Sequence, residues 1–238
     1  MKLATRMSRL GTETAFEVLV RARALEAQGR DVIHLEVGEP DFDTPANVIE
    51  AGVDALRNGW THYGPAAGQP DFRTAIANYL NTARGTNYDL NNIVVTPGGK
   101  PIMFFVILAL LEAGDEAIYP NPGFPIYESM INFTGATAVP APILEENDFA
   151  LDVDGLEALI TPRKLLIINS PSNPTGGVLN REEIAKIAEL AVKYDLTVMA
   201  MKSHRPRYSS KGSTSRSRPC PAWRNARSSS TDSRRRMR

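Results

Sequence analysis

Apolar side chains recur at three- and four-residue steps over residues 13–28, which predicts an amphipathic helix with Thr12 as its N-cap. Similar spacing predicts two further helices over residues 45–58 and 69–83. A short apolar run over residues 32–35 predicts a strand after the first helix.

From residue 93 onward, apolar stretches of strand length alternate with longer stretches of helical spacing. The stretch at 100–111 is expected to be a buried helix entered through Pro101. Repeated strand–helix–strand units with apolar strands predict an α/β fold, a mostly parallel sheet flanked by helices. Strands are predicted at 93–96, 117–119, 137–139, 164–169 and 197–199, and helices at 100–111, 125–133, 152–160 and 181–194.

This pattern stops after Ala200. Residues 201–238 contain ten serines, ten arginines and almost no aliphatic side chains, so burial cannot offset an ordering entropy of about 1–2 kcal/mol per residue. We therefore expect a disordered tail. It holds 12 of the 27 Lys and Arg residues and one acidic residue, Asp232, so the net charge of zero divides into −11 for residues 1–200 and +11 for the tail. Such asymmetry is typical of a segment with a separate role or a different origin.

The sequence also bears on compartment and metal binding. The single cysteine, Cys220, rules out a disulfide within the chain and favours a reducing compartment. The N-terminus lacks a signal peptide, and the longest apolar run, residues 101–111, is shorter than the roughly 20 residues that cross a bilayer. We expect a soluble, cytoplasmic protein without a membrane partner. The three histidines form no cluster with metal-ligand spacing, so no metal site is predicted.

Two turns are candidates for ligand binding. The loop over residues 170–177 follows a predicted strand, and open α/β sheets bind ligands beyond the carboxyl ends of their strands. The glycine pair Gly98-Gly99 with Lys100 precedes a helix, where backbone N–H groups and the helix dipole favour an anion such as phosphate. Both segments are also compatible with ordinary turns, and composition alone leaves the two readings open.

Five motifs in order together resemble the class I and II aminotransferases, the aspartate aminotransferase family. Each motif is weak alone, but the ordered set over about 140 residues is specific. The motifs are GEPDF at 38–42, YGPAAG at 63–68, TPGGK at 96–100, YPNPGF at 119–124 and NPTG at 173–176.

The resemblance implies a pyridoxal 5′-phosphate cofactor bound by a fold type I large domain. By this resemblance, Gly99 and Lys100 would hold the cofactor phosphate. Phe124 would stack on the pyridine ring, and Asn173 would hydrogen bond the phenolic oxygen. A lone Phe is more often a core residue and an Asn in a turn is more often a plain loop residue, so these two roles depend on the family.

The same resemblance extends to the substrate and to a second subunit. The backbone of Gly38 would meet the substrate carboxylate. Tyr63 would reach across an interface to the phosphate of the other subunit, which implies a homodimer. The implied domains are an N-terminal arm with part of a small domain (1–44), an incomplete cofactor-binding large domain (45–200) and the tail (201–238). The implied reaction transfers an amino group between an amino acid and a 2-oxo acid by a ping-pong mechanism; a lyase or decarboxylase on the same scaffold stays open.

Three family elements that would follow Ala200 are absent from the sequence. By the resemblance, they are an Asp-Glu-x-Tyr segment, a Ser-x-Ser-Lys or Phe-Ser-Lys segment whose lysine holds the cofactor as an imine, and an arginine near the C-terminus for the substrate carboxylate. Lys202 and Lys211 lack the surrounding motif, so no catalytic residue is assigned and the chain is expected to be inactive. Whether it acts as an enzyme is therefore left open.

A shift of the reading frame would explain the tail. Codons for residues 228–238 can be chosen so that a shifted frame reads Ile-Leu-Asp-Gly-Phe-Ser-Lys-Thr-Tyr-Ala. We hypothesise that residues 201–238 are a frameshifted reading of the catalytic segment, which sequencing the gene across codons 195–238 tests. In family members, later strands lie between the strand at 93–96 and the one that begins at Lys164. Their loss would expose sheet edges, so we expect poor solubility, which a monodisperse and cooperatively melting sample would contradict.

Two other function classes remain. One is a non-catalytic binding protein whose basic tail contacts nucleic acid, a contact we otherwise expect to be only nonspecific. Deleting residues 201–238 would abolish such a role and leave cofactor binding unchanged. The other is a catalytically inactive partner that dimerises with an intact relative through the Tyr63 face.

Overall fold

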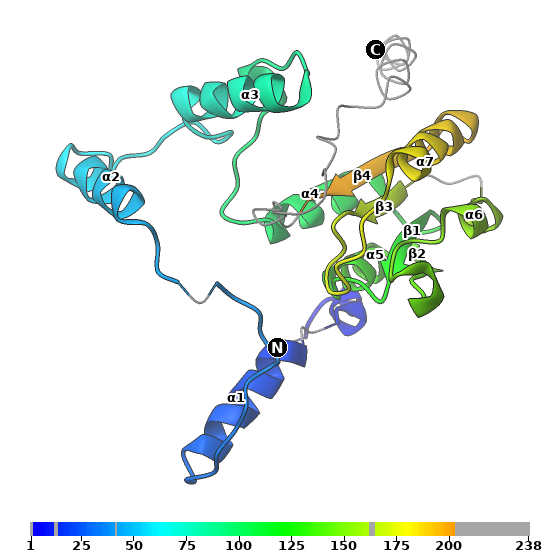
Figure 1. The fold of residues 1–238 in the computed structure, drawn as a ribbon, viewed down its shortest axis with the longest axis horizontal. Coiled ribbons are helices and arrows are strands. Elements are labelled where there is room, and N and C mark those ends of the chain that lie inside the picture. The colour runs from blue at the N-terminus through cyan, green and yellow to red at the C-terminus, as the bar shows by residue number, and fades with distance from the viewer. Residues whose placement is uncertain (1, 12–13, 41, 162–164, 203–238) are drawn as a thin grey trace.

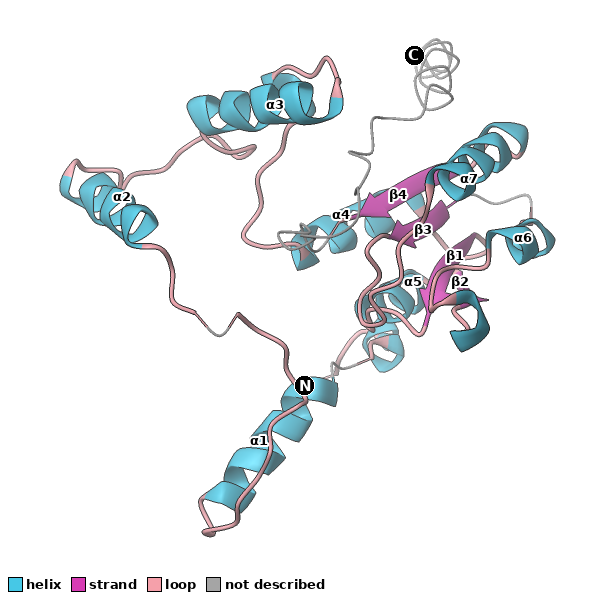
Figure 2. Ribbon diagram, viewed as in Figure 1, coloured by secondary structure: helices cyan, strands magenta, loops and turns pink. Residues whose placement is uncertain are grey.

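The computed structural model describes residues 2–11, 14–40, 42–161 and 165–202. Four parallel strands form one sheet in the order β2-β1-β3-β4 (Figures 1 and 2). The expected N-cap Thr12, and the tail from residue 203 with its expected disorder and nucleic-acid contacts, lie outside the described residues. The strands are β1 (Glu116–Asn121), β2 (Thr137–Pro142), β3 (Leu165–Asn169) and β4 (Thr197–Met201).

Helices connect the strands in the manner that parallel sheets require. The helix α5 (Ile126–Thr134) joins β1 to β2, α6 (Val153–Leu156) with the 3-10 turn η4 (Glu157–Leu159) joins β2 to β3, and α7 (Arg181–Lys193) joins β3 to β4. The predicted α/β fold with a parallel sheet flanked by helices is therefore confirmed.

Each face of the sheet buries its own apolar cluster. On one face, Ile107 of α4 (Lys100–Leu110) and Ile131 of α5 pack with Ile167 of β3. On the other face, Ile187 of α7 packs with Leu166 of β3. Every residue of β3 is buried, which explains why this strand is a continuous apolar run instead of an alternating one.

The N-terminal helices are α1 (Thr14–Glu26), α2 (Ala46–Arg57) and α3 (Pro70–Arg84), close to their predicted bounds. Figure 1 shows α2 and α3 apart from the sheet, joined by extended segments. A short 3-10 turn, η1 (Thr5–Arg9), attaches the start of the chain to α5, since Arg9 Nη2 donates to the carbonyl of Phe133 at 3.2 Å. None of the described helices combines the length and apolar character needed to cross a membrane.

Two predicted strands are wrong. Residues 32–35 form an extended segment in which Ile33 and Leu35 are 83% and 89% exposed. Residues 93–96 lie outside the sheet, and some of their backbone groups make other contacts. Arg73 Nε donates to the carbonyl of Ile93 at 2.9 Å, and the amide of Val95 donates to the carbonyl of Ala67 at 2.9 Å. No strand of the described residues pairs with this segment.

The prediction of a buried helix at 100–111 is correct for the helix and wrong for its burial. Met103 and Ile107 of α4 are buried in the core cluster, but Phe105 is 59% and Leu108 42% exposed. No described element packs over that outer face, so α4 buries one side only.

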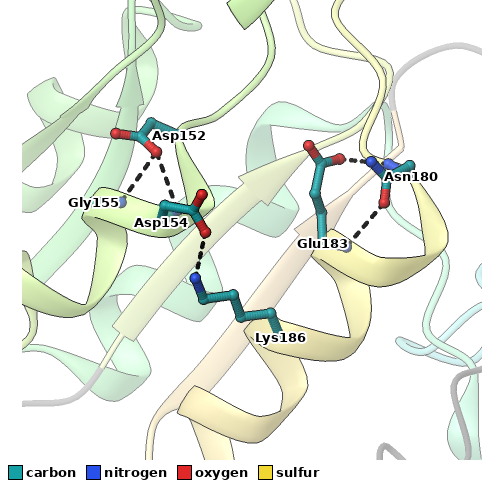
Figure 3. A network of polar contacts seen from close by, with 6 residues as sticks. All are labelled: Asp152, Asp154, Gly155, Asn180, Glu183 and Lys186. Carbon is teal, nitrogen blue, oxygen red and sulfur yellow. Dashed lines mark hydrogen bonds and ion pairs between the residues drawn. The ribbon is translucent and has the colours of Figure 1, made fainter.

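The start of α7 is stabilised by a reciprocal capping arrangement (Figure 3). The Asn180 side chain accepts hydrogen bonds from the amides of Glu182 and Glu183, and Glu183 Oε2 accepts from the amide of Asn180 at 2.6 Å. Nearby, the Asp152 side chain accepts from the amides of Asp154 and Gly155 at the start of α6, and Lys186 of α7 pairs with Asp154. These contacts set where α6 and α7 begin and tie them together.

We expect Asn180→Ala to lower the free energy of unfolding by about 1 kcal/mol, since it leaves two amides of the first turn without their acceptor. Urea unfolding monitored by circular dichroism measures this change. Asn47→Ala is the matched control, because Asn47 is an exposed residue in the first turn of α2, whose N-cap makes no side-chain bond. Equal losses in the two variants would contradict the capping role.

Candidate functional site

The candidate site lies where the parallel strands end. Because β1 and β3 are adjacent and parallel, the loop after Asn121 and the loop after Asn169 lie at the same edge of the sheet. The first loop carries Phe124 and the second carries Asn173, so the fold brings these two predicted residues to one edge.

The loop of residues 170–177 is closed by its own backbone. The amide of Ser172 donates to the carbonyl of Gly177 at 2.8 Å, and the amide of Gly176 donates to the carbonyl of Ser172 at 2.9 Å. Thr175 Oγ1 donates to the carbonyl of Phe149 at 3.0 Å, which fastens the loop to the chain after β2. Asn173 is half-buried within this constrained loop, so its position is set by the backbone around it.

The predicted phosphate turn lies at the N-terminus of α4. Gly98 has a φ of 89°, and Thr96 Oγ1 donates to its carbonyl at 2.6 Å. Gly99 is the N-cap, and Pro101 occupies the first turn of the helix, as predicted. A Cβ added at Gly98 or Gly99 would meet no heavy atom within 4 Å, so the space in front of this turn is open.

The Lys100 side chain extends from the turn toward Phe124, the residue predicted to stack on the cofactor ring. Its Nζ lies 6.0 Å from the centre of the Phe124 ring and 5.1 Å from the centre of the Phe16 ring of α1. Phe124 packs against the buried cluster and meets Tyr127 edge-on, with ring centres 6.1 Å apart. A cation thus lies close to a partly buried aromatic ring and beside an open helix N-terminus, an arrangement that suits a flat, anionic ligand.

The other two predicted residues are not brought to this edge by the described contacts. Tyr63 is fully exposed in the segment between α2 and α3, where it borders a shallow hollow with Trp60 and Gln69. Gly38 is exposed between α1 and α2, with no heavy atom within 4 Å of an added Cβ. The predicted contact of Tyr63 with a second subunit stays a prediction.

The sequence did not reveal a buried polar pair next to these loops. Tyr127 and Asn169 are 0% and 7% exposed, and burial raises the pKa of Tyr127 to about 12. A polar residue at the end of the otherwise apolar strand β3 was the available signal for Asn169. Within the described part of the chain, no group of three or more His, Cys, Asp and Glu residues could hold a metal ion.

The chain is similar to known proteins over most of its length. Residues 30–204 match the family model of class I and II aminotransferases. An aspartate aminotransferase of Musicola paradisiaca is 38% identical over 200 residues, 83% of this chain and 50% of the relative. The aspartate/prephenate aminotransferase of Thermus thermophilus is 41% identical over 186 residues, 77% of this chain and 48% of the relative.

Solved structures give the same result. The aspartate aminotransferase from Thermus thermophilus with maleate superposes with a TM-score of 0.81 at 36% identity, covering 85% of this chain and 53% of that one. The chain therefore spans about half the length of the relatives it matches, and its fold is part of the pyridoxal-phosphate-dependent aminotransferase fold. On the family match, the ordered motifs and the shared fold, the chain belongs to the class I and II aminotransferases.

Proposed function

We propose that the site at the carboxyl ends of β1 and β3 binds pyridoxal 5′-phosphate. We further propose that the family function of this protein is to transfer amino groups between amino acids and 2-oxo acids. The observation that carries this proposal is the approach of Lys100 Nζ to within 6.0 Å of the Phe124 ring. Because of this short distance, the turn predicted to bind phosphate and the residue predicted to stack on the cofactor ring lie together at one edge of the sheet. The open space in front of Gly98 and Gly99 leaves room for a phosphate group.

Each residue of the site has a separate task toward the cofactor. Lys100 supplies a positive charge, and the N-terminus of α4 supplies backbone N–H groups and a favourable dipole for the phosphate. Phe124 covers one face of the ring and excludes water from it, and the amide of Asn173 donates to the phenolic oxygen. When bound, the cofactor supplies the electron sink for chemistry at the amino-acid α-carbon.

We propose that this chain binds the cofactor without a covalent bond and does not turn over amino acids. The residues after Ala200 contain neither a Ser-x-Ser-Lys nor a Phe-Ser-Lys motif. In this proposal Lys100 holds the phosphate instead of forming the covalent bond. Gly38 and Tyr63 would join the site only when the N-terminal segments and a second subunit are positioned on it, so we include a homodimer in the proposal. Gly38 would then contact the substrate carboxylate, and Tyr63 the phosphate of the other subunit.

Titration of the full chain with pyridoxal 5′-phosphate, followed by absorbance and by tyrosine and tryptophan fluorescence, tests the proposal. We expect saturable binding that dialysis reverses. Lys100→Gln should weaken it by about 10- to 100-fold, since hydrogen bonds to charged groups contribute about 1.5–3 kcal/mol. The control is Lys186→Gln, because Lys186 pairs with Asp154 on α6, away from the strand-end loops.

Two outcomes would contradict the proposal. If Lys100→Gln and Lys186→Gln weakened cofactor binding equally, Lys100 would not be part of the phosphate site. Borohydride reduction that fixes the cofactor at one defined lysine, together with turnover of an amino acid, would show that the chain has a covalent anchor and is active.

A further inference from the structure

One histidine lies between two carboxylates in the segment that leaves α1. His34 Nε2 lies 2.9 Å from Oε1 of Glu26, the last residue of α1. On its other side, His34 Nδ1 lies 2.7 Å from Oε1 of Glu36, whose side chain is only 9% exposed. The proposed cofactor site uses none of these three residues, so their arrangement has a separate explanation.

The contacts hold the chain where it turns back on α1. The amide of Gly29 donates to the carbonyl of Glu26 at 2.8 Å, and the amide of Arg30 donates to the carbonyl of Leu25 at 3.3 Å. Gly29 has a φ of 82°, the left-handed conformation that commonly ends a helix. Figure 1 shows the segment after this turn running beside α1. The side chain of His34 therefore bridges the returning segment and the end of the helix.

Apolar burial contributes little to this arrangement. Ile33 and Leu35, the neighbours of His34 in sequence, are 83% and 89% exposed. The polar contacts of His34 with Glu26 and Glu36 are therefore what ties this part of the segment to the helix.

The two contacts require a particular protonation state. A neutral imidazole has an N–H on one nitrogen and a lone pair on the other, so only the imidazolium form donates to both carboxylates. Glu36 does not supply the missing proton, because the hydrogen bond from His34 lowers the pKa of that carboxyl. In turn, the hydrogen bonds to Glu36 and Glu26 raise the pKa of His34. In the described part of the chain, the charged groups that act on His34 are Glu36 of its own segment and Glu26 of α1.

We propose that His34, Glu26 and Glu36 form a pH-sensitive clip that holds the segment leading to Gly38 against α1. Because the pKa of His34 lies above the usual value of about 6.5, the contacts are fully present below that value and are lost as the pH rises through the raised pKa. Because the pKa of Glu36 is lowered, its carboxylate is lost only when the pH falls through that lowered pKa. The clip is therefore closed between these two limits.

Opening the clip releases the stretch that immediately precedes Gly38. An effect of this release on the substrate carboxylate rests on the function proposed above. The clip itself belongs to α1 and the segment after it, and both of its tests are made without cofactor, so failure of cofactor binding is a separate result.

The first test follows the His34 ring by nuclear magnetic resonance as the full chain is titrated. We expect its pKa to lie above the usual histidine value and to fall in both Glu26→Gln and Glu36→Gln, which keep the side-chain shape and remove the charge. The matched control is Glu17→Gln, an exposed acidic residue in the first turn of the same helix, which should leave the titration of His34 unchanged. A usual pKa in the unmodified chain, or equal shifts in all three variants, would overturn the proposal.

The second test measures whether the segment moves. Nitroxide labels are placed at Val20→Cys and Leu35→Cys, which are 69% and 89% exposed, in a Cys220→Ser chain that has no other cysteine. Electron paramagnetic resonance should give a narrower distribution of label distances at about pH 5.5 than at about pH 9, on either side of the histidine titration. This pH dependence should be lost when Glu26→Gln is added and retained when Glu17→Gln is added. The same distribution at both pH values, or a pH dependence that survives Glu26→Gln, would overturn the clip.

Discussion

Truncating Ile167 to alanine is expected to lower the free energy of unfolding by about 2–5 kcal/mol. Ile167 is 0% exposed in β3 and packs in the cluster under α4 and α5, so the change leaves a cavity at the centre of the sheet. Because domains of this size are stable by only about 5–15 kcal/mol, this loss would be a large part of the total. Urea unfolding followed by circular dichroism measures it.

The control for Ile167→Ala is Val178→Ala, which shortens an apolar side chain that is 62% exposed. We expect this surface change to alter stability by no more than about 0.5 kcal/mol. Comparable losses in the two variants would mean that β3 is not the centre of the folded core.

Substituting Gly177 by alanine is expected to cost about 3 kcal/mol and to displace the loop that carries Asn173. An added Cβ would overlap the carbonyl oxygen of Phe149 and would lie 2.5 Å from its carbonyl carbon and 2.8 Å from the amide nitrogen of Ala150. These are backbone atoms, so no side-chain rotation relieves the overlap. Denaturant unfolding measures the stability, and limited proteolysis within residues 170–177 detects the displaced loop.

Gly38→Ala is the matched control for Gly177→Ala. An added Cβ at Gly38 would meet no heavy atom within 4 Å, so we expect neither a loss of stability nor faster cleavage of the 170–177 loop. If Gly177→Ala were as well tolerated as this control, the close packing of the loop against Phe149 would be wrong.

The sequence predicted the elements whose signals are local. The spacing of apolar residues over 181–194 predicted a helix, and α7 spans Arg181–Lys193. The apolar run of β3 is flanked by turn residues, and the strand has nearly its predicted length. Side-chain spacing and turn chemistry are sufficient for such elements, because they depend on neighbours in sequence.

The errors concern features that depend on distant parts of the chain. Residues 93–96 have the composition of a strand, but a strand also needs a partner, and no strand of the described residues pairs with them. The apolar composition of α4 predicted burial, yet burial depends on which element covers each face. For the site, motif order predicted Lys100 and Phe124, which the fold brings together. The pairing of Tyr127 with Asn169 has no signal in local sequence.

The order of the strands has a consequence for synthesis on the ribosome. All four strands of the sheet and the helices α5, α6 and α7 come from one continuous stretch, Glu116 to Met201. Chains emerge from the N-terminus at about 5–20 residues per second, so the whole sheet is available to a nascent polypeptide once residue 201 has left the exit tunnel. The hypothesised frameshift begins at Met201, the last residue of β4, so it leaves β1, β2, β3 and the rest of β4 unchanged. Translation would then release a preassembled α/β layer followed by foreign residues, which differs from the unstructured product of an early frameshift.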